Sequence, residues 1–432
     1  METYGCQMNV ADSELIEGML HREGYTSTTE MNKADAIFVN TCAIREHAED
    51  KVHSRLGIFN KVKQDNPGVI IGVLGCMAQN LKDDLLVNKP YVDIILGPDA
   101  YRRLPDYLRR NEQKNHIVDT KLSRFEVYGD LFPSRKEGIN AWVSIMRGCD
   151  KFCTFCIVPF TRGRERSRSL NSIIAEVSQA VSDGFVEITL LGQNVNSYQS
   201  TSIRFPQLLE AVAEVEGVQR IRYTSPHPQD VTEELLEVMA SHNTICNSIH
   251  FPLQSGSDRI LKRMNRTYTK DHFLRQVYMM REKIPHIGIS TDIIVGFPGE
   301  TEADFQETLD VIAQVNFDSA FTFKYSARPF TKAVEYEDQI PEEEKQNRLE
   351  RLIQLQKEHS LANNKKIIGS VQSVLIEKES KKSASHWAGR TDSNKWVIFP
   401  KENSVKKETV PVQILETSGI SLQGEIDNKS YA

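Results

Sequence analysis

The sequence predicts an α/β protein of three units: an N-terminal parallel α/β domain, a central partial (β/α)6 barrel and a small C-terminal β-barrel. Short apolar runs alternate with helical patterns up to about residue 330, which is typical of parallel sheets. Beyond residue 366, short strand-like runs follow one another without helices between them. We place the units at residues 1–110, 138–366 and 367–432, with a linker at 111–137.

In the first unit, apolar runs at 36–40, 69–74 and 93–96 are predicted as strands buried on both faces. Cys6, Cys42 and Cys76 each follow a predicted strand and precede a helical stretch, at separations of 36 and 34 residues. This is about one βαβ unit, so the three thiols should lie at one edge of the sheet, where such folds bind ligands. The phasing predicts a three-thiolate centre; the alternative is three buried structural cysteines.

The second unit contains six predicted strands, too few to close an eightfold barrel, so we predict an open partial barrel. The strands are 141–145, 187–191, 220–223, 248–251, 287–295 and 319–324, with helical periodicity at 170–182, 231–241, 270–283 and 301–314. A further helix begins after Pro341 and runs to about Lys366. Active sites of such barrels lie at the carboxyl ends of the strands.

The third unit has strand-like runs at 371–376, 396–399, 410–415 and 420–424, separated by Lys, Ser and Gly, and we expect a tight turn at 389–392. This pattern predicts a small β-barrel. Small β-barrels with basic loops commonly hold RNA or single strands. A purely structural appendage is the alternative.

The composition is that of an ordinary globular protein, with 39% hydrophobic and 26% charged residues in 432. No apolar run approaches the ~20 residues of a membrane span, and no signal peptide is recognised, so we expect no membrane and a cytoplasmic location. Seven cysteines without a disulfide-rich segment suit a reducing compartment. The net charge is −6, yet residues 147–168 carry +4 and residues 361–432 carry +3. These two basic regions favour a polyanionic partner.

Cys149, Cys153 and Cys156, spaced x3 and x2, follow the first barrel strand. Three thiolates can hold a [4Fe-4S] cube while one iron stays open to an exogenous molecule. The alternatives are stray buried thiols or an incomplete zinc site, although zinc motifs normally pair CxxC with a second CxxC or HxxxH. The remaining Cys246 is predicted to be a small core residue.

The Cys149-x3-Cys153-x2-Cys156 motif resembles the cluster motif of the radical S-adenosylmethionine (SAM) enzymes. The resemblance implies that SAM chelates the open iron and that its reductive cleavage yields a 5′-deoxyadenosyl radical. It also implies that further contacts to SAM surround the cluster. The candidates are Phe155, Gly192, Gln193, Asn194, Ser225, Gly296 and Arg168, with Asn196 and Arg166 as further contacts to SAM, base or RNA phosphate.

The whole chain resembles the radical-SAM methylthiotransferases, which join a three-cysteine α/β domain, a radical-SAM barrel and an RNA-binding TRAM barrel. The matching motifs are closest to the branch of tRNA-2-methylthio-N6-dimethylallyladenosine synthases (MiaB type). They lie at 2–9, 40–45, 75–79, 149–163, 191–198 and 254–258. One departure is Phe330, which stands where this family usually has a glycine after the proline.

The resemblance implies methylthiolation of C2 of N6-dimethylallyladenosine at position 37 in the tRNA anticodon loop. It implies two [4Fe-4S] clusters, an auxiliary one on Cys6, Cys42 and Cys76 and a SAM-binding one on the second triplet. It also implies two SAM per turnover, an electron donor, a sulfur or cluster-rebuilding donor, and a monomer. The alternatives are a ribosomal-protein methylthiotransferase, which residues 7–9 disfavour, and a non-catalytic iron-sulfur RNA-binding sensor.

Overall fold

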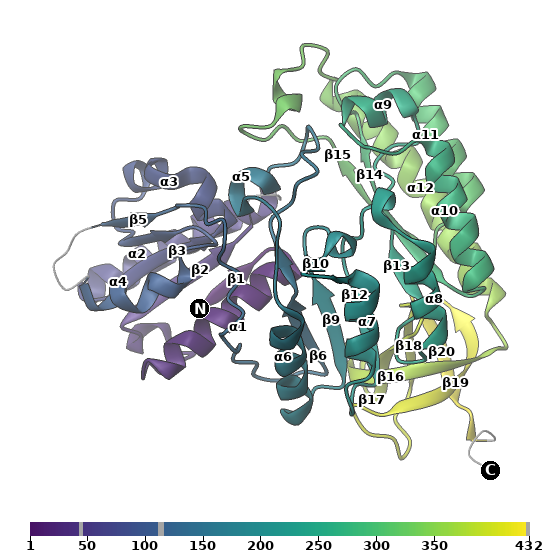
Figure 1. Ribbon diagram of the computed structural model, residues 1–432, viewed down its shortest axis with the longest axis horizontal. Coiled ribbons are helices and arrows are strands. Elements are labelled where there is room, and N and C mark those ends of the chain that lie inside the picture. Colours follow the sequence, from purple (N-terminus) through teal and green to yellow (C-terminus); the bar gives the residue numbers. More distant parts are fainter. Residues whose placement is uncertain (43–45, 111–115, 429–432) are drawn as a thin grey trace.

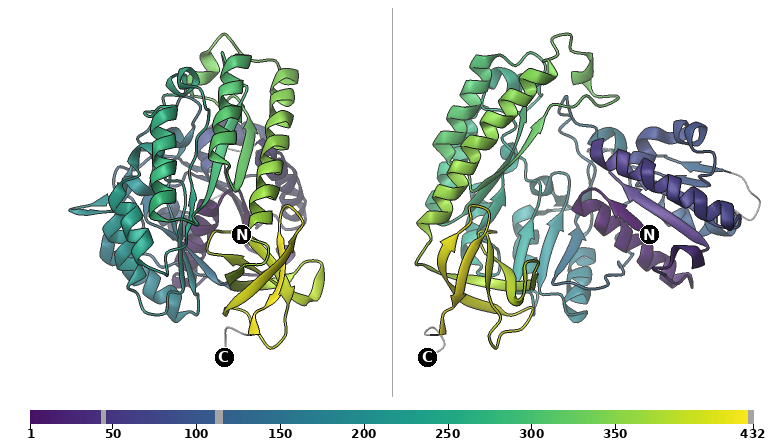
Figure 2. Two further views of the ribbon diagram at one scale, coloured as in Figure 1. Left: turned by 90° about the vertical axis from the view of Figure 1, so that its right-hand side faces the viewer. Right: turned by 180° about the vertical axis from the view of Figure 1, so that it is seen from behind.

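A computed structural model describes residues 1–42, 46–110 and 116–428 and shows three units in chain order (Figure 1). The N-terminal domain lies beside one half of the central barrel, and the C-terminal barrel lies under its lower end (Figures 1 and 2). The predicted fold class is confirmed. Among the described helices, none combines the length and the apolarity that crossing a bilayer requires.

The N-terminal domain is a parallel sheet whose described strands follow chain order. The strands are β1 (Glu2–Tyr4), β2 (Ala36–Thr41), β3 (Ile70–Gly75), β4 (Ile94–Leu96) and β5 (Ile117–Asp119). The helices are α1 (Gln7–Arg22), α2 (Glu46–Asp65), α3 (Cys76–Asn88) and α4 (Leu104–Arg110). Apolar clusters cover both faces, which explains the continuous apolar runs. Strand β5 lies in the predicted linker and was not predicted, because three residues carry no periodicity.

The central unit contains the six predicted strands within its described residues, arranged as two parallel three-stranded sheets. These are β6 (Asn140–Ser144), β9 (Glu187–Leu191) and β12 (Arg220–Tyr223), and then β13 (Ser248–His250), β14 (Gly288–Val295) and β15 (Ser319–Lys324). An isolated backbone bridge between Ile221 and Ile245 connects β12 to the chain leading into the second sheet, instead of a continuous strand pairing. The partial-barrel prediction is therefore confirmed, with a break in its middle.

Helices cover the outer side of these strands (Figure 2). They are α6 (Leu170–Ser182), α7 (Phe205–Ala213), α8 (Glu233–Ser241), α10 (Lys270–Lys283), α11 (Glu302–Val315) and α12 (Glu342–Lys366). Shorter elements lie in the loops: β7 (Met146–Arg147), α5 (Val158–Arg162), β8 (Arg166–Ser167), β10 (Gln199–Ser200), β11 (Ile203–Arg204) and α9 (Asp258–Arg263). The predicted end of the long helix at Lys366 is confirmed.

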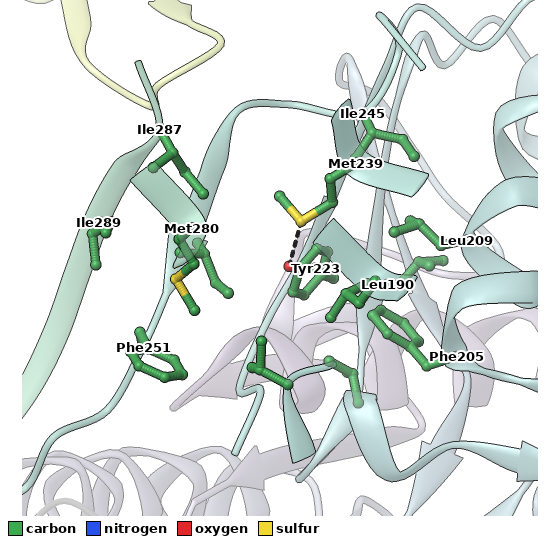
Figure 3. Close-up of a cluster of buried hydrophobic side chains, with 14 of the residues drawn as sticks. Leu190, Phe205, Leu209, Tyr223, Met239, Ile245, Phe251, Met280, Ile287 and Ile289 are labelled. Atoms are coloured by element: carbon green, nitrogen blue, oxygen red, sulfur yellow. Dashed lines mark hydrogen bonds between the residues drawn. The ribbon is translucent and has the colours of Figure 1, made fainter. Parts of the chain in front are cut away.

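The barrel core lies between the strands and these helices (Figure 3). Leu190 on β9 and Tyr223 on β12 point towards α7 and α8, and the Tyr223 ring meets Phe205 edge-on at 5.1 Å between centroids. The Tyr223 hydroxyl donates to Met239 Sδ at 3.0 Å, which satisfies its one buried polar atom. Side chains within the strands, such as these two, pack into the core. The predicted site residues lie instead in the loops after the strands.

The C-terminal unit is a closed β-barrel in its described residues. Its strands are β16 (Val371–Ser380), β17 (Ser383–Thr391), β18 (Trp396–Pro400), β19 (Thr409–Thr417) and β20 (Leu422–Ile426). The predicted tight turn at 389–392 is wrong, because Gly389 to Thr391 lie in β17 and the turn follows them. Strand β17 was missed since Ser383, Ser385 and His386 at its start are polar. A Cβ at Gly389 would lie 2.3 Å from the Leu375 carbonyl oxygen, so glycine permits close strand approach.

The C-terminal barrel docks on the amino ends of the central strands. Arg220, which begins β12, donates to the Ser373 carbonyl at 3.0 Å. Glu187, which begins β9, is fully buried and pairs with Arg222 at 3.1 Å and Arg390 at 2.7 Å. The C-terminal barrel therefore lies at the opposite end of the strands from the loops that carry Cys149, Cys153 and Cys156.

Candidate functional site

The first three cysteines meet at one edge of the N-terminal sheet. Cys6 directly precedes α1, Cys42 follows β2, and Cys76 is the first residue of α3. Strands β1, β2 and β3 are parallel neighbours, so their carboxyl ends share this edge. Gly5 has a φ of +135°, and a Cβ there would lie 2.7 Å from Cys42 Cβ. Glycine thus allows the loops of Cys6 and Cys42 to approach one another.

The environment favours the thiolate at Cys6 and disfavours it at Cys76. The pKa of Cys6 is lowered to about 6, chiefly because Cys42 hydrogen-bonds to it, while burial acts in the opposite direction. Burial raises the pKa of Cys76, and the neighbouring Arg162 guanidinium opposes that rise. Cys6 Sγ also lies 3.3 Å from Asn9 Oδ1. A thiol that is largely ionised near neutral pH is ready to bind metal.

The second triplet lies in a loop that neighbouring segments hold in place. The Cys149 amide donates to the Gly163 carbonyl at 3.1 Å, and the Thr154 amide donates to the Met264 carbonyl at 3.0 Å. Arg266 Nη1 donates to Cys153 Sγ at 3.3 Å. Burial raises the pKa of Cys149 to about 11 and that of Cys156 to about 12, so these thiols lose their protons only when they bind a cation.

Several of the residues with left-handed backbone lie in the loops after the barrel strands. They include Phe152 (φ +45°), Ser225 (+58°), Gln254 (+68°), Gly296 (+67°) and Phe330 (+66°). Such conformations cost side-chain-bearing residues roughly 1–3 kcal/mol and cluster at functional sites. Phe330 shows why the family usually has glycine there. Its ring is 64% exposed and lies 6.3 Å from that of Phe160.

The structure places most of the predicted SAM contacts at this same barrel end. Gly192, Gln193 and Asn194 follow β9, Ser225 follows β12, and Gly296 follows β14. The Phe155 ring meets Phe297 edge-on at 6.5 Å. Gln193 Oε1 is buried without a hydrogen-bond partner in the described parts of the chain. An orphaned acceptor at this position suits a ligand that brings an ammonium or hydroxyl donor.

Other predicted contacts are committed to the fold itself. Asn194 Nδ2 donates to Asp230 Oδ2 at 2.9 Å, and its Oδ1 accepts from the His227 amide at 3.2 Å. Asn196 Oδ1 accepts from that same amide at 2.8 Å. These amides hold the loop after β12 against the loop after β9. They therefore position the segment that carries Ser225.

The two predicted arginines are occupied by protein groups. Arg168 is buried and binds Glu176 at 2.5 Å, with further bonds to Ser172 and to the Ser144 carbonyl at 2.8 Å. Arg166 pairs with Asp99 of the N-terminal domain at 2.9 Å. Both guanidinium groups are engaged by protein acceptors, so the proposed site does not include them.

Helix α5 joins the two cysteine triplets. It begins two residues after Cys156 and is five residues long. Ile157, next to Cys156 in the chain, packs against Cys76. Arg162, at the other end of α5, lies beside Cys76 and Cys6 and pairs with Asp12 of α1 at 2.9 Å. The triplets, more than 70 residues apart in sequence, are therefore neighbours on either side of one short helix.

The two donor sets consist of thiols, which is the ligand type of iron-sulfur clusters. In the described chain, no three Cys, His or carboxylate side chains converge as ligands of one metal ion. A [4Fe-4S] cube binds each thiolate through a different iron, so its ligands need not converge on one point. Thiolate-only ligands also suit iron-sulfur chemistry rather than hard cations.

Comparison with known proteins matches three families in succession along the chain. Residues 1–97 match the uncharacterized protein family UPF0004, residues 143–312 the radical SAM superfamily, and residues 365–426 the TRAM domain. A tRNA-2-methylthio-N(6)-dimethylallyladenosine synthase from Christiangramia forsetii is 46% identical over 98% of this chain and 93% of its own length. The protein of the same name from Parabacteroides distasonis is 47% identical over 98% of this chain and 94% of its own length. The chain belongs to this synthase family.

Solved structures support the fold of this synthase family member. The radical SAM methyltransferase TsrM from Kitasatospora setae gives a TM-score of 0.59 at 12% identity, covering 84% of this chain and 77% of its own. The cobalamin-dependent radical SAM enzyme OxsB gives a TM-score of 0.56 at 14% identity, covering 72% of this chain and 51% of its own. At such identities the likeness shows a shared fold.

Sequence reasoning missed three charged residues of the site. Arg162 lies inside the matching motif at 149–163, but the motif indicates no role for it. Asp12 and Arg266 carry no sequence signal of their own. Asp12 lies within an ordinary amphipathic helix, and Arg266 lies 110 residues beyond the cysteine loop that it contacts. Only tertiary contacts identify such partners.

Proposed function

We propose that this chain is a tRNA methylthiotransferase that adds a methylthio group to C2 of N6-dimethylallyladenosine at position 37. Family membership supports the assignment. The observation that carries it is the contact between Ile157 and Cys76. A radical generated at one centre and a methylthio group supplied at the other must reach the same base, and α5 keeps the two cysteine triplets adjacent.

In this proposal Cys149, Cys153 and Cys156 hold the SAM-binding [4Fe-4S] cluster, and Cys6, Cys42 and Cys76 hold the auxiliary one. One SAM serves as methyl donor and a second as the source of the 5′-deoxyadenosyl radical. An aromatic C2–H is neither acidic nor a leaving group, so acid–base catalysis alone has little effect on it.

The chain's own residues would bind and orient SAM. Phe155 would flank the adenine, and Gly192, Ser225 and Gly296 would allow close approach at the strand ends. Gln193 Oε1 would accept a hydrogen bond from the SAM ammonium. Arg266 would hold Cys153 in its ligating position through the 3.3 Å contact.

The RNA would contact both ends of the barrel. The target base must leave its stack to enter the site, which is easier in a loop than in a duplex. The C-terminal barrel lies at the opposite strand ends, and β14 alone is eight residues long, roughly 26 Å. The C-terminal barrel would therefore hold a part of the tRNA distant from the modified base.

The proposal also includes partners for turnover. Reductive cleavage of SAM needs an electron donor, and transfer of sulfur needs a donor that rebuilds the auxiliary cluster. We propose that the enzyme acts as a monomer in the cytoplasm, with domain boundaries at residues 110, 138 and 367.

Two measurements test the assignment. Anaerobic reconstitution should give about eight irons per chain, and only four would reject two clusters. Mass spectrometry of tRNA nucleosides from a deletion strain should show loss of the 2-methylthio group and its return with this chain. Persistence of the modified nucleoside in the deletion strain would reject the substrate.

Single-cluster variants separate the alternatives. Cys76→Ala should still form 5′-deoxyadenosine from SAM and reductant, yet make no methylthio product. A sensor without turnover would form no 5′-deoxyadenosine even in the unmodified chain. A ribosomal-protein methylthiotransferase would leave the tRNA nucleosides unchanged.

A further inference from the structure

Arg162 is a buried cation at the boundary between the two cysteine triplets. It is the last residue of α5 and is only 4% exposed. Its Nη2 donates to Asp12 Oδ2 at 2.9 Å. Its guanidinium also lies beside the Cys76 and Cys6 thiols. A residue of the barrel unit is thus inserted at the thiol edge of the N-terminal sheet.

One nitrogen of the Arg162 guanidinium has no hydrogen-bond acceptor among the described residues. This nitrogen is Nη1, which is buried. Leaving a buried charged donor unpaired is costly, so such a group in a native protein calls for an explanation. Arg147 pairs with the same carboxylate at 2.5 Å, but its guanidinium lies over the Tyr128 ring at 4.6 Å. Arg162 instead borders the thiols.

We propose that Arg162 is a positioning residue that donates a hydrogen bond from Nη1 to an anionic sulfur of the group held by Cys6, Cys42 and Cys76. This inference rests on the proposed function. The bond from Nη2 to Asp12 Oδ2 restrains the guanidinium group, while Nη1 stays free to donate. Positive charge and hydrogen bonds at cluster sulfurs raise the reduction potential. Arg162 therefore tunes the auxiliary cluster from the domain that cleaves SAM.

The experiment compares Arg162→Gln, Arg162→Lys and Arg147→Gln in the full chain after anaerobic reconstitution. The midpoint potential of the auxiliary cluster is measured by electron paramagnetic resonance, with C149A/C153A/C156A in each variant so that one cluster contributes. Arg147→Gln is the matched control, because it also loses a bond to Asp12 but does not border the thiols. Parallel assays without the triple substitution follow 5′-deoxyadenosine and methylthiolated RNA.

Arg162→Gln should shift the auxiliary potential to more negative values and reduce methylthiolation at least about tenfold, while 5′-deoxyadenosine formation continues. Arg162→Lys, which keeps the charge but offers a single nitrogen, should shift the potential less. Arg147→Gln should leave it unchanged. An unshifted potential in Arg162→Gln, or an equal shift in Arg147→Gln, overturns the proposal.

Two further outcomes remain decisive. If Arg162→Gln does not take up iron, the comparison of Arg162→Lys with the unsubstituted chain decides, and identical potentials overturn the proposal. If the unsubstituted chain binds only four irons, the proposed two-cluster function is rejected. This outcome is distinct from an unshifted potential, which rejects the role of Arg162.

Discussion

The two interfaces that flank the central barrel each contain a buried carboxylate and two arginines, but the arginines differ in how fully they are hydrogen-bonded. At the N-terminal interface, the fully buried Asp12 pairs with Arg147 and Arg162. At the C-terminal interface, the fully buried Glu187 pairs with Arg222 and Arg390. In each case one carboxylate from one domain is held between two guanidinium groups.

The difference lies in the remaining N–H groups. The other nitrogens of Arg222 reach Ser248 Oγ at 2.9 Å and the Thr391 carbonyl at 2.8 Å. In contrast, Nη1 of Arg162 and two nitrogens of Arg147 have no hydrogen-bond partner in the described chain. A buried ionic group without full pairing is costly. We infer that the C-terminal interface is purely structural, whereas a ligand completes the N-terminal one at Arg162; the Arg147 guanidinium instead lies over the Tyr128 ring.

The largest effect is expected at the C-terminal interface. Glu187→Ala leaves Arg222 and Arg390 without their shared carboxylate and should lower the free energy of unfolding by about 3–5 kcal/mol. Chemical denaturation measures it. Glu379→Ala removes an exposed partner of Lys401 within the C-terminal barrel and should change the free energy of unfolding by less than about 1 kcal/mol. Equal losses in both variants would contradict the structural role of Glu187.

Asp12→Asn should lower the free energy of unfolding of the cluster-free protein by about 2–3 kcal/mol, which is less than for Glu187→Ala. The reason is that Arg147 and Arg162 are already incompletely paired in the cluster-free protein. Reconstitution should reduce this loss, since an anionic sulfur group then pairs with Arg162. The loss in Glu187→Ala should be the same before and after reconstitution. Denaturation of both variants in both states checks the comparison, and a ligand-independent loss in Asp12→Asn would remove the distinction between the interfaces.

The cysteine-bearing end should also carry a pH dependence. Burial, with Arg266 and Lys151 nearby, lowers the pKa of His227 to about 2. Between pH 6.5 and pH 2 the unfolded chain binds a proton here that the folded chain does not, so stability falls as pH falls. Roughly 2 kcal/mol should be lost from pH 6.5 to pH 5, since each pKa unit corresponds to about 1.4 kcal/mol. His227→Asn should flatten the slope, and an unchanged slope would show that other groups set it.

The smallest effect concerns backbone strain at the same end. Phe330→Gly relieves the left-handed conformation, and Phe330→Ala removes the same exposed ring but keeps the Cβ. The glycine variant should therefore be more stable than the alanine variant by about 1 kcal/mol. Thermal unfolding of the pair measures the difference. Equal stabilities would mean that the loop relaxes around residue 330.

Much of the fold followed from local patterns. Apolar runs at 36–40 and 187–191 predicted parallel strands because burial on both faces requires continuous apolar sequence. Strand β17 escaped because its residues alternate weakly, and β5 because three residues show no period. The turn expected at Gly389 was wrong for a physical reason: this glycine serves close strand approach, not a positive φ.

The sequence by itself determined that each cysteine triplet lies at strand carboxyl ends, because thiol spacing and strand phasing are local properties of the chain. It also predicted these six cysteines as the cluster ligands. Only the tertiary structure decided that Ile157 contacts Cys76, that Arg162 reaches the first triplet and that Arg168 is committed to Glu176. Those contacts join segments far apart in the chain, and an arginine's role depends on which acceptors folding brings to it.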